Sequence, residues 1–179
     1  MEFKLDQAIE ILERSPNVIR EMLQGLSPDW LHNNEGGESF SPFVVLGHLV
    51  YGELTDWIPR ARIILNQGEK RTFDPYDRFA QLTLYKDTPL EELLDKFASL
   101  RKKNLDELKS INISDEKLEL KGKHPDIGTV TLKQLLATWV VHDLNHIAQI
   151  ARVMARQYSD EVGPWKKHNP ILLNRLPNP

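Results

Sequence analysis

Two histidines, His142 and His146, stand four positions apart in a segment whose apolar residues recur with helical spacing. At 3.6 residues per turn, both side chains lie on one face of a helix, and here it is the apolar face. Burying two imidazoles is costly, because each ring keeps a hydrogen-bond donor and an acceptor. A shared divalent metal ion removes this cost, whereas hydrogen bonds to carbonyls or water at a bundle edge are the alternative.

A third histidine, His48, lies within residues 44–50, where its neighbours are apolar enough to be core. Gly52 and Thr55 follow on its side of the predicted helix, and such small residues leave space beside an inward-facing ring. Sites in helical bundles are built from side chains that face one another across helices. Three inward histidines on two helices suit a three-nitrogen metal site with open positions, and spacing alone leaves a plain buried cluster as the alternative.

Three polar residues near these histidines have open roles. Glu53 is five positions past His48 and points in another direction, so we expect either a surface position or a supporting one. Asp143 is expected to face outward or toward a neighbouring helix, and Gln149 either reaches the site or ends the apolar stripe. None of them is identified as a general base, and the catalytic residues stay unknown. The remaining histidines are expected to be solvated: His32, His124 and His168.

Four segments of helical periodicity must position these side chains. They cover residues 4–25, 41–65, 88–108 and 131–153. Start signals support them: Ser41 before Pro42, and capping boxes that begin at Thr88 and at Thr131. Amphipathic helices of this length without a convincing strand pattern predict an all-α four-helix bundle that forms one domain over residues 1–179.

The expected irregularities lie at prolines and in the connections. Pro16 should kink or restart the first helix, with Ser15 as the cap of its second piece, and Pro59 should bend the second. Residues 118–120 could form a short extended piece, and residues 176–179 should fray. The longer connections leave the order of helix directions open.

Composition narrows the function classes. The formal net charge is −3 and the basic residues are scattered, which argues against a nucleic-acid partner. No cysteine is present, so a metal must be held by His, Asp or Glu, and any thiol in the chemistry must come from outside. The sequence shows neither a signal peptide nor an apolar run long enough for a membrane span, and we expect a cytoplasmic protein.

The histidine motifs resemble those of the DinB/YfiT-like superfamily. Residues 139–152 (WVVHDLNHIAQIAR) look like its last-helix signature, and Ser41-Pro42 leading to residues 46–49 (LGHL) looks like its second-helix signature. Residues 124–128 (HPDIG) and 162–165 (VGPW) also fit members of the group. The resemblance spans essentially the whole chain.

The resemblance implies a four-helix bundle, commonly a homodimer, with one zinc or nickel ion held by His48, His142 and His146. Some members transfer low-molecular-weight thiols such as bacillithiol to electrophiles, and others are described as metal-dependent hydrolases. We therefore expect thiol S-transfer to an electrophilic small molecule. Hydrolysis by a metal-bound water and a non-catalytic metal-binding role are the alternatives.

Overall fold

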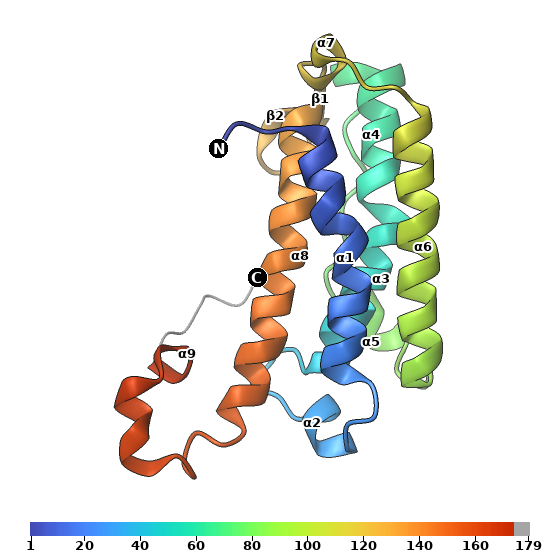
Figure 1. Cartoon of the computed structure of the whole chain (residues 1–179). Coiled ribbons are helices and arrows are strands. Elements are labelled where there is room, and N and C mark those ends of the chain that lie inside the picture. The colour runs from blue at the N-terminus through green and yellow to red at the C-terminus, as the bar shows by residue number, and fades with distance from the viewer. Residues whose placement is uncertain (174–179) are drawn as a thin grey trace.

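Four helical segments lie side by side in the computed structural model, which describes residues 1–173 (Figure 1). The chain descends in α1, ascends in α3–α4, ascends again in α6 and descends in α8, so the bundle is not a simple up-down-up-down one (Figure 1). Each of α1 and α3 packs against both α6 and α8. The predicted four-helix bundle is confirmed. Its helices are α1 (Leu5–Leu23), α3 (Pro42–Thr55), α4 (Trp57–Asn66), α6 (Leu90–Ser110) and α8 (Leu132–Arg156).

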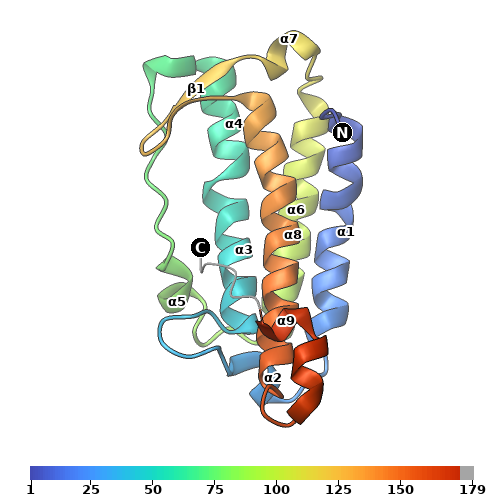
Figure 2. The ribbon, with the colours of Figure 1, turned by 90° about the vertical axis from the view of Figure 1, so that its left-hand side faces the viewer.

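Short elements fill the connections. Because α4 ends and α6 begins at opposite ends of the bundle, the connection between them runs back along its length, beside α3 (Figure 2). The expected extended piece at residues 118–120 is wrong, since Leu118 ends a helical turn and the strands come later. These elements are α2 (Pro28–His32), η1 (Gly68–Lys70), α5 (Ala80–Leu84), α7 (Asp115–Leu118), β1 (Lys121–His124), β2 (Gly128–Thr131), η2 (Gly163–His168) and α9 (Pro170–Leu173).

The β1–β2 hairpin sits tightly against α4. Its strands pair antiparallel, with Lys121 opposite Thr131. The hairpin also contacts the connection between α4 and α6 (residues 67–89, the crossing connection) through a hydrogen bond from the Phe73 N–H to the Lys123 carbonyl (2.9 Å). A Cβ atom at Gly122 would lie only 2.6 Å from the Ile64 side chain and 2.9 Å from the Phe73 ring. Glycine at this position therefore lets the hairpin approach α4 and Phe73 closely.

Pro16 does not restart the first helix, because α1 is continuous from Leu5 to Leu23. Ser15 donates a hydrogen bond back to the Ile11 carbonyl (3.1 Å) instead of capping a second piece. Proline has no N–H for the carbonyl four residues earlier, which is that of Leu12. The Arg101 Nη1 atom donates to this carbonyl at 2.8 Å, so a side chain from α6 replaces the missing helical bond.

The structure confirms only some of the other predicted helix boundaries. The second helix divides at Asp56, which separates α3 from α4, because Pro59 cannot bond to the carbonyl one turn before it. The capping box at Thr131 is formed with Gln134. The one at Thr88 is not, since α6 begins after Pro89 without a side-chain cap.

No helix within residues 1–173 is long and apolar enough to cross a membrane. The expected fraying of residues 176–179 concerns residues outside the described part of the chain.

Candidate metal centre

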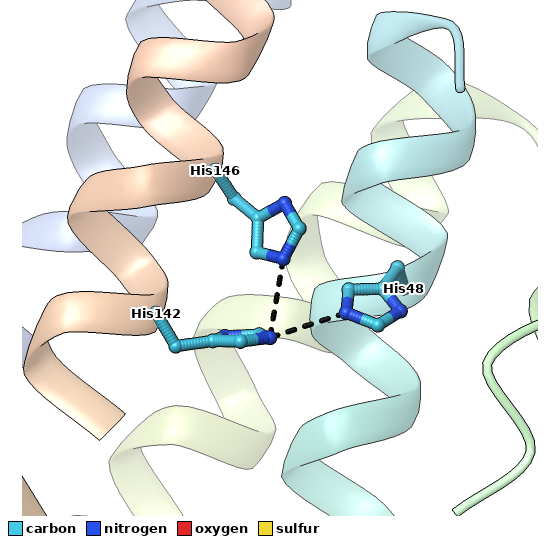
Figure 3. A group of neighbouring side chains, drawn as sticks. All are labelled: His48, His142 and His146. Carbon is cyan, nitrogen blue, oxygen red and sulfur yellow. Dashed lines mark hydrogen bonds between the residues drawn. The ribbon is translucent and has the colours of Figure 1, made fainter. Parts of the chain in front are cut away.

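The three predicted histidines meet in the structure. His48 projects from α3, and His142 and His146 project from adjacent turns of α8, with their rings converging (Figure 3). The His142 Nε2 atom lies 3.1 Å from the Nε2 of His48 and 3.1 Å from that of His146. The three ligand atoms lie within 4.8 Å of one another. Nitrogen ligands of a tetrahedral zinc ion are about 3.3 Å apart, given bonds of about 2.0–2.1 Å, so the spacing suits a shared ion.

The outward-facing nitrogens of two rings are held by neighbours. The Nδ1 atom of His48 lies 3.2 Å from the hydroxyl of Tyr76, which itself donates toward the His48 carbonyl (3.4 Å). The Nδ1 atom of His146 lies 2.7 Å from the amide oxygen of Gln149, so the inward position proposed for Gln149 is confirmed. Such contacts from a second layer of residues orient metal-binding rings and fix their tautomers.

These contacts create a conflict that a metal ion relieves. When the Nδ1–H of His48 donates to Tyr76 and that of His146 donates to Gln149, both Nε2 atoms carry lone pairs. Both lone pairs face the Nε2 atom of His142, and a neutral ring offers at most one proton there. One of the two 3.1 Å contacts therefore joins two acceptors unless a cation lies between the rings. The donor set, three neutral imidazoles, fits zinc or nickel.

His142 is oriented by packing rather than by a hydrogen bond. Its Nδ1 atom is buried without a hydrogen-bond partner in the described residues. Its ring stands edge-on to Trp57, with ring centroids 5.0 Å apart, and Trp57 in turn stacks on Trp139 at 5.6 Å. The paired indoles thus form the wall against which this histidine rests.

Burial keeps the three imidazoles neutral. The pKa of His48 is lowered to about 3, mainly by burial and further by electrostatic interactions with His146 and Arg78. Burial and the two other histidines hold the pKa of His142 well below its ordinary value. Burial also lowers the pKa of His146, although the bond to Gln149 opposes it. Neutral imidazole is the form that binds a metal, so the site is ready for an ion at neutral pH.

The three rings line a cavity of about 690 Å³. Aromatic side chains form much of its wall, and the β1–β2 hairpin and the crossing connection close one side. Because the cavity reaches all three histidines, a small molecule can approach the point where their Nε2 atoms converge. Its other wall residues include Phe40, Trp57, Phe73, Tyr76, Asp56, Arg60, Arg78, His124 and Asn145.

Comparison with known families is consistent with this geometry. Residues 11–150 match the DinB superfamily. The chain belongs to the DinB superfamily. No curated protein matches the sequence.

Two solved structures share the four-helix-bundle fold of this chain. YfiT from Bacillus subtilis, described as a probable metal-dependent hydrolase with an unusual four-helix bundle topology, superposes with a TM-score of 0.73 at 23% identity. The match covers 89% of this chain and 87% of YfiT. The four-helix bundle protein TT2238 superposes with a TM-score of 0.55 at 22% identity, over 83% of this chain and 98% of that one.

Beside the histidines, this DinB-superfamily chain buries a charged cluster that ties four helices together. Arg101 of α6 donates to Glu53 of α3 (2.8 Å), to Asp143 of α8 (2.6 Å) and to the Leu12 carbonyl of α1. Burial opposes the charge of Arg101, but Asp143 and Glu53 raise its pKa above the ordinary value. Asn104 completes the cluster with a bond to Glu53 (2.9 Å).

The charged cluster shows where the side chains of Glu53 and Asp143 lie, which the sequence left undecided. Glu53 is 2% exposed, so its surface role is excluded, and it also accepts a bond from the Trp139 indole (3.1 Å). Asp143 is fully buried and faces α6, which confirms the inward alternative. Asp143 adjoins His142 in the sequence, and Trp139 supports the indole against which His142 rests. The cluster therefore holds the segment of α8 that carries two of the three histidines.

The remaining histidines stay apart from the centre. His32 and His168 are exposed, as expected. His124 is only half-buried: it belongs to β1, lines the cavity and accepts a hydrogen bond from the Asp126 N–H (3.1 Å). Its expected solvation is thus only partly correct, because the hairpin folds it against Phe73.

Proposed function

We propose that this protein is a metal-dependent enzyme that holds one divalent ion, zinc or nickel, between His48, His142 and His146. The observation that carries the proposal is the convergence of three neutral Nε2 atoms, 3.1 Å apart in two of the pairs, at the wall of a 690 Å³ cavity. A merely structural metal site is closed by its ligands, whereas a catalytic one keeps a position open to solvent or substrate. The adjoining cavity supports the catalytic alternative.

An ion bound by three neutral imidazoles supplies a positive charge that lowers the pKa of a coordinated thiol or water. The protein's own residues orient the imidazole rings and form the cavity wall. Tyr76 and Gln149 hold two of the rings so that Nε2, and not Nδ1, faces the centre. Trp57 and Phe40 contribute apolar surface to the cavity wall, against which the apolar part of a substrate could pack.

Within this class, we propose transfer of a low-molecular-weight thiol, bacillithiol-like, to an electrophilic small molecule. Hydrolysis commonly uses a carboxylate to take a proton from water and return it to the leaving group. No carboxylate in residues 1–173 is hydrogen-bonded to the three imidazoles, whose partners are a phenol, an amide and each other. A thiol makes a smaller demand, because it ionises near neutral pH once its pKa is lowered.

Metal-dependent hydrolysis is the second candidate, and the likeness to YfiT favours it. The cavity contains two carboxylates that could serve a water nucleophile, Asp56 and Asp126. Asp56, however, is already paired with Arg60 at 2.5 Å, and Asp126 is exposed at the hairpin turn. These positions support hydrolysis less well than thiol transfer.

A conjugation assay separates the two reactions. Metal-loaded protein is mixed with monochlorobimane and one of several thiols, and in parallel with small esters and amides without thiol. S-transfer predicts fluorescence that requires both the thiol and the metal, and that is lost after chelation or in His142→Ala. Turnover of esters without any thiol dependence would instead establish the hydrolase, and conjugation of none of the thiols would end the transferase proposal.

A further inference from the structure

The hairpin end of the cavity contains a buried arginine that the proposed reaction does not use. Arg60 of α4 is 8% exposed and lines the same cavity as the three histidines. Its guanidinium lies over the Phe73 ring at 5.3 Å from the centroid, and Phe73 contacts the ring of His124 on β1. The arginine therefore sits where the hairpin, the crossing connection and α4 meet.

One edge of this guanidinium is fixed, and the other is not engaged. Asp56, one turn earlier, forms an ion pair with the Nε atom (2.5 Å), while the guanidinium lies over the Phe73 ring. Within residues 1–173, Nη1 and Nη2 donate no hydrogen bond to a protein acceptor. The buried Arg101, by contrast, donates hydrogen bonds to protein acceptors from Nε, Nη1 and Nη2.

The unused edge has a well-defined chemical preference. The two Nη atoms of arginine match the two oxygens of a carboxylate and bind them with parallel, charge-assisted hydrogen bonds. Burial strengthens such a pair, because less water competes for the charges. The positive charge of Arg60 is felt nearby, since burial and then Arg60 lower the pKa of His124. Aromatic walls at Trp57 and Phe73 suit an apolar body next to that carboxylate.

We propose that Arg60 is a specificity-determining residue that binds the carboxylate of a substrate whose apolar body occupies the cavity beside the three histidines. The substrate class is therefore small aryl or alkyl carboxylates, with the carboxylate on either the electrophile or the thiol. Asp56 orients the guanidinium and is not itself a substrate ligand. The inference deepens the proposed function, but carboxylate binding at Arg60 requires neither metal nor turnover.

The second arginine of the cavity wall, Arg78, is the competing anchor. It is exposed and lies over the Phe79 ring at 5.0 Å, so water screens its charge more strongly. An Arg78→Met variant distinguishes the two positions. The matched control is Arg62→Met, because Arg62 belongs to the same helix but pairs with Glu107 on the outer surface.

The test compares acids with their neutral amides. Benzoate, phenylacetate and 3-phenylpropionate, and the three corresponding amides, are titrated calorimetrically into the protein, both as purified and after chelation. We expect at least one acid to bind about ten-fold more tightly than its amide, with and without metal. Arg60→Met should reduce this ratio to near one, Arg60→Lys should retain part of it, and Arg62→Met and Arg78→Met should leave it unchanged.

Several results would overturn the inference: no preference for any acid in the wild type, an unchanged ratio in Arg60→Met, or loss of the preference only in Arg78→Met. Loss of the preference on chelation alone would also overturn it, since the metal would then be the anchor. If Arg60→Met does not fold, Arg60→Lys is used instead, because lysine keeps the charge beside Asp56 but lacks the two parallel Nη donors. An acid-to-amide ratio below that of the wild type then supports the inference, and an unchanged ratio overturns it. A failure of conjugation or hydrolysis leaves these binding ratios unaffected, so the two proposals fail separately.

Discussion

The Nε2 atoms of His48 and His142 lie 3.1 Å apart, although these residues are 94 positions apart and belong to different helices. Each ring is oriented from its own side: His48 by Tyr76 of the crossing connection, and His142 by Trp57 at the start of α4. The relation between the two rings therefore depends on how α3, α4 and α8 pack, and changes in that packing should be visible in metal affinity.

The Tyr76 hydroxyl should contribute to metal affinity without contributing to the fold. Tyr76→Phe removes the bond to the His48 Nδ1 atom and keeps the aromatic ring. We expect the dissociation constant for zinc to rise about 10- to 100-fold, as for other residues that support metal ligands. Competition with a chelating dye measures it, and Tyr158→Phe, at an exposed tyrosine, is the control. Equal affinities for both variants and the wild type would show that Tyr76 has no supporting role.

Arg101 should be essential to stability. Arg101→Met leaves the carboxylates of Glu53 and Asp143 buried without their cation and leaves the Leu12 carbonyl without a donor. Breaking a buried pair in this way costs about 3–5 kcal/mol of unfolding free energy. Urea denaturation of the chelated protein measures the change. Arg62→Met, which removes a surface pair, should cost only about 0–1 kcal/mol. Similar losses of unfolding free energy in both variants would mean that the buried charged cluster contributes no more to stability than a surface ion pair.

Acid should destabilise the metal-free protein through His48. Burial lowers its pKa to about 3 from the ordinary 6.5, so below pH 6.5 the unfolded chain takes up the proton first. The unfolding free energy should therefore fall by about 1.4 kcal/mol per pH unit from this residue as pH decreases. Comparison of wild type with His48→Gln between about pH 6 and 4.5 isolates the effect. The variant should show the shallower slope, and identical slopes would contradict the burial of a neutral imidazole.

The histidines could be predicted from the sequence because residue type and helical period together determine which side chains share a face. The same rule held a signal for Arg101 and Asn104, which follow Phe97 at positions four and seven later on the apolar stripe of α6. Arg101 is charged and Asn104 is a polar amide, and such side chains on an apolar stripe indicate buried hydrogen-bond partners. Glu53 was ambiguous for the corresponding reason, since its partner Arg101 lies 48 positions away.

Other features had no local signal. Tyr76 reaches His48 only because the connection between α4 and α6 runs back along the bundle, and a loop sequence does not record that path. The β1–β2 hairpin lacks an alternating apolar pattern, and its position depends on the close approach at Gly122. The continuity of α1 through Pro16 likewise depends on a donor from α6. Tertiary contacts, rather than local preference, decided all three.

Metal content of the purified protein tests the central claim most directly. It is measured by mass spectrometry for the wild type, for His48→Ala, His142→Ala and His146→Ala, and for His124→Ala, a histidine of the same cavity outside the centre. We predict about one zinc or nickel ion per chain in the wild type and in His124→Ala, and less than about 0.1 in each of the other three. Equal metal content in all five proteins would contradict the assignment of the three histidines as ligands.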